Sequence, residues 1–256
     1  MSQSNQSELE KRHKAEKTFH DQKLSKGADK NFYELGFKSI IFNDLLGKIG
    51  KLTNKKVLDF GCGSGWQSKI FAGREAEVWA FDISEEAVKQ ANQLVNNLNL
   101  NNKVHVHQMA AEKLALQSNT FDIVIGNAIL HHLDIELALE EIHRILKRGG
   151  KAYFLEPLGH NPFVNLYRKF TPGIRTKDEV PLRIECFEII RKKFSRFNHE
   201  EYYLLTLMSF FWYFIIRNDK LLLRTRTWLF KLDRLLFKIF PHLKKYCWYT
   251  ILEMEK

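Results

Sequence analysis

Short apolar runs alternate with amphipathic segments through the middle of the chain. The runs have the length and composition of buried strands, so we expect strands at residues 57–60, 76–81, 104–107, 121–125 and 151–155. The segments between them predict helices at residues 66–72, 84–97 and 134–146. Because strands and helices alternate, the expected architecture is a parallel sheet covered by helices on both faces. Ligands of such sheets bind beyond the carboxyl ends of the strands.

The amino-terminal part of the chain is polar and charged. Residues 1–9 are expected to be disordered, and residues 11–23 to form a solvated helix of mixed charge. Residues 33–49 carry apolar side chains at helical spacing, which predicts a helix that packs on the sheet. We therefore assign residues 1–30 to a polar, partly disordered segment that precedes the domain.

The pattern changes again after the fifth strand. We expect helices that begin at Asn161 and Leu182, and strands at residues 197–207 and 248–254. Residues 210–243, which lie between these two strands, are basic and rich in aromatic side chains. The predicted organisation is a single domain at residues 31–256 with a helical insertion at about 210–243.

A glycine-rich turn follows the first predicted strand. Asp59 ends this strand, and Gly61, Gly63 and Gly65 follow at alternate positions before the helix that starts at Trp66. Glycine lets the backbone bend sharply and lets a ligand lie against it without a Cβ in the way. Free N–H groups at the helix start favour an anionic group such as a carboxylate.

Two cofactor classes use such a turn. A dinucleotide loop requires glycine at the sixth position of G-x-G-x-x-G, where this chain has Trp66. Asp59 would repel a pyrophosphate and would suit an ammonium or a sulfonium-bearing ligand. A nicotinamide-dependent oxidoreductase is therefore the weaker interpretation of the turn.

Charge is unevenly distributed along the chain, whose net charge is +10. Residues 1–146 hold 18 basic and 19 acidic residues, whereas residues 147–256 hold 22 and 11. This asymmetry indicates an anionic partner such as a membrane surface, an acidic substrate or a nucleic acid. The polar amino terminus has no apolar core of a secretory signal, and the three cysteines are sparse, so the cytoplasm is the expected compartment.

The D-x-G-x-G-x-G form of the turn resembles the first motif of Rossmann-like (class I) S-adenosylmethionine-dependent methyltransferases of the small-molecule type. Further matching segments are Asp82, Ala111-Glu112-Lys113-Leu114, Phe121-Asp122, residues 129–133 and residues 146–150. The resemblance covers residues 57–156. It implies a doubly wound α/β fold with a seven-stranded mixed sheet, strand order 3-2-1-4-5-7-6, and a helical insertion before the last strand.

The resemblance also implies S-adenosyl-L-methionine as the cofactor. In this family the acid that ends the second strand binds both ribose hydroxyls, which assigns that role to Asp82, and Ile83 would cover the adenine. Met109-Ala110 replace the family's Gly-Asp pair, so backbone groups near Ala111 are expected to contact the adenine. The full set of expected cofactor-binding residues is Asp59, Gly61, Cys62, Gly63, Gly65, Asp82, Ile83, Ala111, Glu112 and Asn127.

Methyl transfer requires a base only when the acceptor atom must lose a proton. His132 and Glu156 are the expected catalytic residues, with His20, Tyr33 and His160 as further candidates for the base. No metal site is expected, because the cysteines have no metal-type spacing and His105 and His107 merely alternate on a strand.

The acceptor is expected to be a small molecule or lipid-like. The fourth strand ends Gly126-Asn127-Ala128-Ile129 and lacks the Asn-Pro-Pro-Tyr type element of amino-methylating enzymes, which makes a nucleic acid an unlikely acceptor. Residues 202–216 are apolar but too short to cross a bilayer. Residues 221–240 predict either a substrate lid or an interfacial helix that contacts anionic lipid, so peripheral membrane contact is open. A catalytically silent cofactor-binding or membrane-associated partner protein also stays open, as does the oligomeric state.

Overall fold

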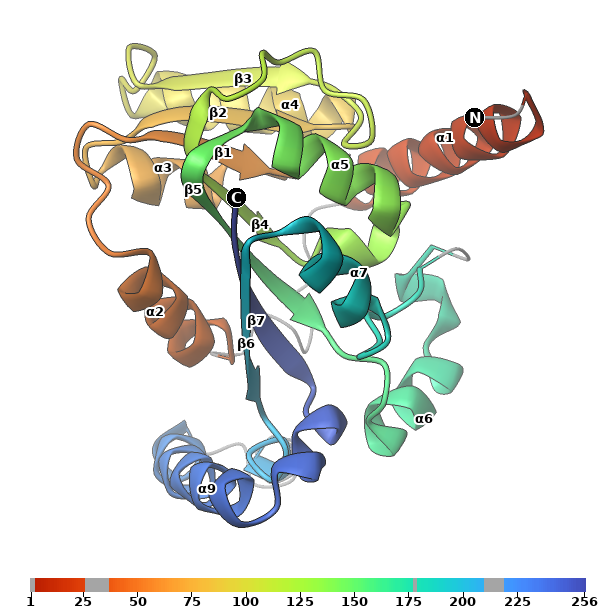
Figure 1. Ribbon diagram of the computed structural model, residues 1–256, viewed down its shortest axis with the longest axis vertical. Coiled ribbons are helices and arrows are strands. Elements are labelled where there is room, and N and C mark those ends of the chain that lie inside the picture. Colours follow the sequence, from red (N-terminus) through yellow and green to blue (C-terminus); the bar gives the residue numbers. More distant parts are fainter. Residues whose placement is uncertain (1–2, 26–36, 177–178, 210–218) are drawn as a thin grey trace.

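A computed structural model of the chain describes residues 3–25, 37–176, 179–209 and 219–256, and it contains one seven-stranded sheet (Figure 1). The strand order is β3-β2-β1-β4-β5-β7-β6, which confirms the expected order. Neighbouring strands from β3 to β5 are parallel, and β7 pairs antiparallel with both β5 and β6. The strands are β1 (Lys56–Phe60), β2 (Glu77–Asp82), β3 (Val104–Gln108), β4 (Phe121–Asn127), β5 (Leu146–Pro157), β6 (Arg196–Tyr202) and β7 (Tyr249–Glu255).

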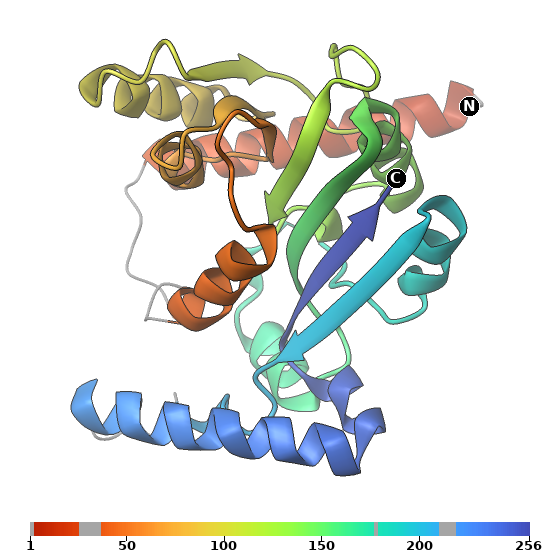
Figure 2. The ribbon, with the colours of Figure 1, turned by 60° about the vertical axis from the view of Figure 1, so that its left-hand side comes forward.

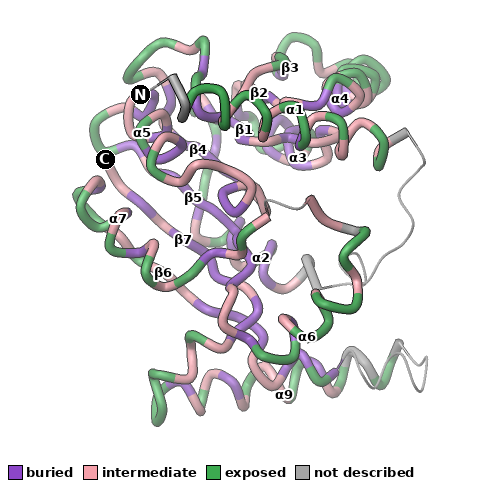
Figure 3. Tube along the Cα trace, turned by 90° about the vertical axis from the view of Figure 1, so that its right-hand side faces the viewer, coloured by how far each residue is buried: buried purple, intermediate pink, exposed green. Residues whose placement is uncertain are grey.

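Each face of the sheet has its own apolar core, because successive side chains of a strand point to opposite faces. Val57 and Ile125 belong to one core, and Leu58 and Val124 belong to the other. The helices α2 (Phe37–Ile49) and α3 (Trp66–Ala72) contribute to the first core, and α5 (Ile135–Ile145) and α7 (Cys186–Lys193) contribute to the second. The tube view shows this buried centre between exposed outer turns (Figure 3). The remaining helical elements are α1 (Gln3–Ser25), α4 (Glu85–Asn97), η2 (Leu130–His132), α6 (Pro162–Phe170), η3 (Pro172–Ile174), α9 (Asp219–Ile239) and η4 (Pro241–Tyr246).

Helix starts follow the capping residues that the sequence offers. Ser84 caps α4 by accepting a hydrogen bond from the Ala87 N–H, and Asp134 caps α5 in the same way. Asn161 caps α6, as expected. Two strand boundaries differ from the prediction by more than two residues. β5 already begins at Leu146, because Gly149 adopts a left-handed φ of 71° and lets the chain continue in the sheet. β6 already ends at Tyr202.

Helix α1 corrects the expectation of a disordered start, because residues 3–9 are already helical. The helix also does not stand apart from the domain. Figure 1 shows it beside α4, which it contacts through polar pairs rather than an apolar stripe. The Lys17 ammonium lies 3.2 Å from the Glu85 carboxylate, and the Asp21 carboxylate accepts a hydrogen bond from the Ser84 hydroxyl. Apolar periodicity cannot reveal such a contact.

Helix α9 and helix α6 lie towards the same end of the molecule, although Figure 1 shows them apart rather than side by side (Figures 1 and 2). Helix α9 falls within the expected insertion, whose residues 210–218 lie outside the described part. Among the described helices, none has a continuous apolar stretch of the length needed to cross a bilayer.

Candidate active site

A cavity of about 200 Å³ lies at the carboxyl ends of the parallel strands. The glycine turn forms one side of it through Gly61 and Gly63, and α1 closes another side through His13, Glu16 and His20. Of the residues predicted from the sequence, eight line this cavity: Gly61, Gly63, Asp82, Ile83, Ala111, Glu112, Asn127 and His132. Asp59, Cys62, Gly65 and Glu156 do not line it.

Two glycines of the turn have different roles. Gly63 has a φ of +52°, and a Cβ built on it would have no protein atom within 4 Å. Gly63 lines the cavity, so a ligand in the cavity can lie against its backbone in this open space. Gly65 has a φ of +80°, and a Cβ there would lie 3.1 Å from the Ala91 Cβ. Gly65 thus allows α3 to approach α4 and does not need to touch a cofactor.

Asp82 holds the turn in place while it faces the cavity. One carboxylate oxygen accepts a hydrogen bond from the Gly63 N–H at 2.9 Å, and the other accepts one from the Ser84 N–H at 2.9 Å. Each oxygen of a carboxylate has a second lone pair. The side chain can therefore still accept hydrogen bonds from a diol in the cavity.

Asp59 is completely buried behind the turn, where it accepts a hydrogen bond from the Ser68 hydroxyl at 2.5 Å. Its other oxygen, Oδ1, has no hydrogen-bond partner among the described residues. Burial, together with the nearby Asp82 charge, raises the pKa of Asp59 to about 7. Beside it, the buried Cys62 thiol donates to the Gly63 carbonyl, and burial raises its pKa too, so this thiol is no nucleophile.

Glu156 does not line the cavity, because its carboxylate is bound to neighbouring groups behind it. Its Oε1 accepts hydrogen bonds from the N–H groups of Ile129 and Leu130, both at 2.9 Å. Its Oε2 lies 2.7 Å from Nδ1 of His131, and the side chain is fully buried. Glu156 is therefore a positioning residue that fixes the start of η2 and, through it, the neighbouring His132.

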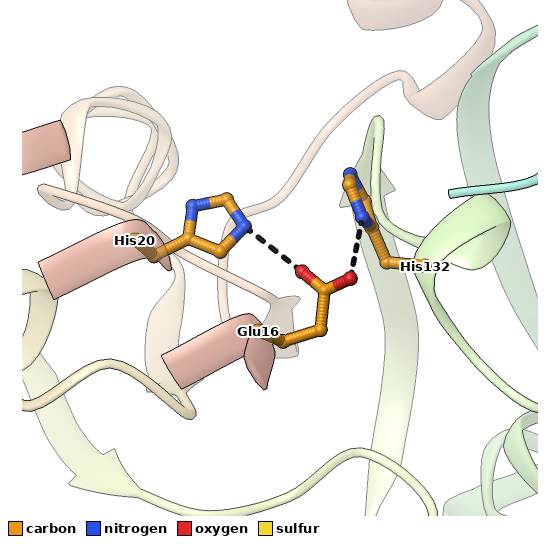
Figure 4. Close-up of side chains that lie close together, drawn as sticks. All are labelled: Glu16, His20 and His132. Carbon is orange, nitrogen blue, oxygen red and sulfur yellow. Dashed lines mark hydrogen bonds and ion pairs between the residues drawn. The ribbon is translucent and has the colours of Figure 1, made fainter. Parts of the chain in front are cut away.

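His132 faces the cavity and meets helix α1 there (Figure 4). Its Nδ1 lies 3.3 Å from Oε1 of Glu16, and Oε2 of Glu16 lies 3.4 Å from Nε2 of His20. Desolvation lowers the pKa of His132, although the Glu16 carboxylate opposes that shift. Burial alone would raise the pKa of Glu16, but the hydrogen bonds to His132 and Thr176 and the nearby His20 ring hold it well below its usual range.

The further base candidates are placed differently. His20 lines the cavity, as the sequence allows, whereas His160 accepts a hydrogen bond from the Ile184 N–H at 3.1 Å and does not line it. Tyr33 lies outside the described residues. Sequence reasoning missed Glu16, whose only signal is its place one helical turn before His20. It also missed His13, which lies 2.9 Å from the Glu112 carboxylate.

Part of the chain is similar to known methyltransferases. The family described as "Methyltransferase domain" matches residues 58–154. Ubiquinone biosynthesis O-methyltransferase from Nitrosomonas europaea is 34% identical over 121 residues, which are 46% of this chain and 50% of that protein. The protein of the same name from Pseudomonas syringae is 36% identical over 120 residues. The chain spans about half the length of these curated relatives.

Solved structures share the fold over most of the chain. Phosphoethanolamine N-methyltransferase 2 from Haemonchus contortus superposes with a TM-score of 0.62 at 16% identity, over 93% of this chain and 60% of that one. Geranyl diphosphate C-methyltransferase from Streptomyces coelicolor gives 0.61 at 13% identity, over 90% and 85%. Residues 58–154 are therefore similar to a methyltransferase domain, and the strand order of the whole sheet is that of the solved methyltransferase structures.

Proposed function

We propose that this protein transfers a methyl group from S-adenosylmethionine to an oxygen or nitrogen of a small-molecule or lipid-like acceptor. The observation that carries the proposal is the cavity itself. Asp82 and the glycine turn form one part of its wall, and His132 with its Glu16 partner forms another. A cofactor site and a proton acceptor thus share one space at the carboxyl ends of the strands.

The residues present fit the cofactor. Asp82 has free lone pairs for the ribose hydroxyls, and the open space at Gly63 leaves room beside the backbone. Asp59 does not line the cavity but lies directly behind the turn, with one buried oxygen unpaired among the described residues, so its carboxylate would attract the ammonium of the methionine moiety from there. When bound, the cofactor supplies an activated methyl group on a sulfonium that is a good leaving group. The protein's task is to hold the acceptor atom in line with that bond, about 3 Å from the methyl carbon.

The pair of Glu16 and His132 can remove a proton from an acceptor hydroxyl. A carboxylate only accepts hydrogen bonds, so Nδ1 of His132 carries the hydrogen that faces Glu16. The lone pair of His132 then resides on Nε2, which can take the proton. The lowered pKa of His132 keeps the imidazole neutral near pH 7. This arrangement favours O-methylation, which is also the reaction that the names of the O-methyltransferase relatives give.

We also propose that the end of the molecule formed by α6 and α9 contacts an anionic membrane. We call this the α6–α9 surface. Its exposed apolar side chains are Phe163, Leu166, Phe170, Trp228, Leu235, Ile239 and Phe240. Exposed basic residues lie among them on the same helices, at Lys169, Arg224, Lys231 and Lys238. Mixed apolar and basic faces of this kind bind the interface of anionic bilayers. None of the described residues of α9 lines the cavity, so we do not assign a lid role to these residues.

Calorimetry with S-adenosylmethionine, S-adenosylhomocysteine and NAD tests the cofactor. Micromolar-range binding of the first two ligands and none of NAD is expected. Gly63→Ala should weaken binding at least tenfold, because its methyl group enters the open space beside the turn. Gly50→Ala is the matched control, since Gly50 has a similar φ of +74° and open surroundings but does not line the cavity.

The acceptor is sought with methyl-labelled S-adenosylmethionine and a metabolite extract, followed by mass spectrometry. Label in a small apolar or lipid-like product supports the proposal. Cofactor binding without any labelled product would favour the catalytically silent partner protein. Tight binding of NAD in place of S-adenosylmethionine would favour the oxidoreductase and end the methyltransferase proposal.

A further inference from the structure

Glu16, His20 and His132 form a compact group of metal-ligating side chains at the cavity. Glu16 and His20 are one turn apart on α1, and His132 comes from η2 on the other side (Figure 4). One ligand atom from each residue can be chosen so that all three lie within 4.8 Å of one another. All three residues line the cavity. The sequence predicted no metal site on the ground of the cysteine spacing and of His105 and His107. Glu16 and His132 lie more than a hundred residues apart, so sequence spacing could not bring them together.

The Glu16 carboxylate lacks a permanently charged partner. The side chain is only 7% exposed, and its Oε2 accepts no hydrogen bond among the described residues. Within the same part of the chain, its ion pairs are with His20 and His132, while Thr176 donates a hydrogen bond at 2.6 Å. An ionised carboxylate is costly to bury unless a cation lies beside it. A bound metal ion would supply that charge at all times, whereas a histidine does so only when it is protonated.

The second group of metal-ligating side chains consists of His131, His132 and Glu179, and its carboxylate already has positively charged partners. Glu179 lies near His131 and His132, but the guanidinium groups of Arg168 and Arg175 are 3.2 Å and 3.7 Å from it. His131 is already bound through Nδ1 to Glu156. Two fixed positive charges thus occupy the place that an ion would take. Glu179 is thus paired with two guanidinium groups, whereas the ion pairs of Glu16 among the described residues are with histidines alone. Of the two carboxylates, Glu16 is therefore the one to which a bound cation would add a permanent positive charge.

The spacing at Glu16 matches one particular class of ion. Two atoms bound to the same tetrahedral zinc ion at about 2.0–2.1 Å lie roughly 3.4 Å apart. Nε2 of His20 lies 3.4 Å from Oε2 of Glu16, and Nδ1 of His132 lies 3.3 Å from Oε1, so each nitrogen is next to a different oxygen of the carboxylate. Each nitrogen–oxygen distance is that of two neighbouring ligands of one ion, which would lie between the two imidazoles and contact the carboxylate through one or both oxygens. Two imidazoles and a carboxylate are a ligand set typical of zinc and related divalent transition metals.

We propose that Glu16, His20 and His132 bind one divalent transition metal ion of the zinc class. Three protein ligands leave a fourth position open, as in catalytic zinc sites, and this position can face the cavity. The ion would join α1 to η2 and so hold the helix over the cavity. An ion bound to Nδ1 of His132 would replace the hydrogen that the proposed function places there, so the ion-bound site and the Glu16–His132 base are two alternative states of the same residues. The inference goes beyond methyl transfer, because binding of the metal is measured without cofactor or acceptor.

Metal titration of the full chain, after removal of metal by a chelator, tests the proposal. Calorimetry with Zn²⁺ should show one equivalent that binds with micromolar or tighter affinity. Co²⁺ should give the visible absorption of a tetrahedral site with nitrogen and oxygen ligands. His20→Asn should weaken both signals about a hundredfold or more, since even partners outside the ligand shell are worth about ten- to a hundredfold. His20 is suited to this test because its side chain is 34% exposed, so the variant should fold.

His13→Asn is the matched control. His13 lies on the same helix and lines the same cavity, but it is bound to Glu112 and belongs to neither group of ligands. Its variant should bind Zn²⁺ within about threefold of the wild type. Glu16→Gln should behave like His20→Asn, with circular dichroism as the check on folding. The proposal is overturned if the wild type binds no equivalent of metal, or if His20→Asn and His13→Asn bind it equally well.

Discussion

At the scale of single residues, two aspartates beside the glycine turn differ because their surroundings differ. Asp82 has both oxygens bound to backbone N–H groups and still faces the cavity. Asp59 is buried with one oxygen unpaired, so its pKa rises to about 7. The sequence predicted a polar role for both residues. It could not predict their protonation, because burial depends on residues far away in the chain.

The raised pKa of Asp59 predicts that cofactor affinity depends on pH. An ammonium requires the ionised carboxylate, so binding must displace a proton wherever the free protein holds Asp59 protonated. Affinity should therefore rise by up to about tenfold per pH unit below pH 7 and level off above it. Calorimetry with S-adenosylhomocysteine between pH 5.5 and 8.5 measures this. Asp59→Asn should bind more weakly and give a flat profile, and a flat profile of the wild type would rule out this role for Asp59.

In the proposed function, His132 takes the proton of the acceptor. His132→Asn should lower kcat by about a hundredfold or more for a hydroxyl acceptor, while cofactor affinity stays within about threefold. Because desolvation lowers the pKa of His132, kcat should rise with pH through a value below the usual 6.5 and be flat near pH 8. His143→Asn serves as the control, since His143 lies on α5 away from the cavity. If His132→Asn keeps its turnover, another residue is the base, and His20 is the next residue to substitute.

At the scale of elements, the sequence predicted the sheet well and helix α1 poorly. Each strand presents apolar side chains to one or both cores, and that burial leaves a pattern in the sequence. Helix α1 instead docks through charged and polar pairs, such as Lys17 with Glu85. Charged residues are also typical of a solvated helix, so the pattern could not distinguish the two. The role of Glu156 was missed for a similar reason, because its partners in η2 are distant in sequence.

The contact between α1 and α4 predicts how a substitution outside the cavity changes proteolysis of α1. Asp21 accepts hydrogen bonds from the Ser84 hydroxyl and from the Glu86 N–H, so it joins α1 to the start of α4. Asp21→Ala should loosen this contact and increase tryptic cleavage at Lys14 and Lys17 several-fold, since local opening exposes the backbone. Mass spectrometry of the fragments measures the cleavage. Glu10→Ala, at an exposed position of the same helix, should cleave like the wild type.

An equal cleavage rate in Asp21→Ala and Glu10→Ala would show that other contacts hold the helix. The activity of the two variants then separates docking from chemistry. Because α1 supplies Glu16 and His20 to the cavity, Asp21→Ala should raise KM for the acceptor more than it raises Kd for the cofactor.

At the scale of the whole molecule, charge and exposed apolar surface coincide. The excess of basic residues lies after residue 146, and this half of the chain contains both helices of the α6–α9 surface. Phe163, Phe170 and Trp228 are 68%, 78% and 64% exposed, although side chains of this size are usually buried. The sequence predicted the basic and aromatic insertion, but not that α6 lies towards the same end of the molecule as α9 (Figure 2).

Membrane contact by the α6–α9 surface predicts salt-sensitive sedimentation with anionic vesicles. Each Lys or Arg near such a bilayer contributes roughly 1 kcal/mol, which salt screens. The wild type should sediment with phosphatidylserine vesicles in low salt and largely stay in the supernatant in high salt. Trp228→Glu should keep its melting temperature, because the ring is exposed, but lose most of the sedimentation. Leu98→Glu, an exposed apolar position at the end of α4, should sediment like the wild type. A lower melting temperature of Trp228→Glu would instead show that the ring packs against the protein. If the wild type does not sediment with the vesicles at either salt concentration, the proposed membrane contact is wrong.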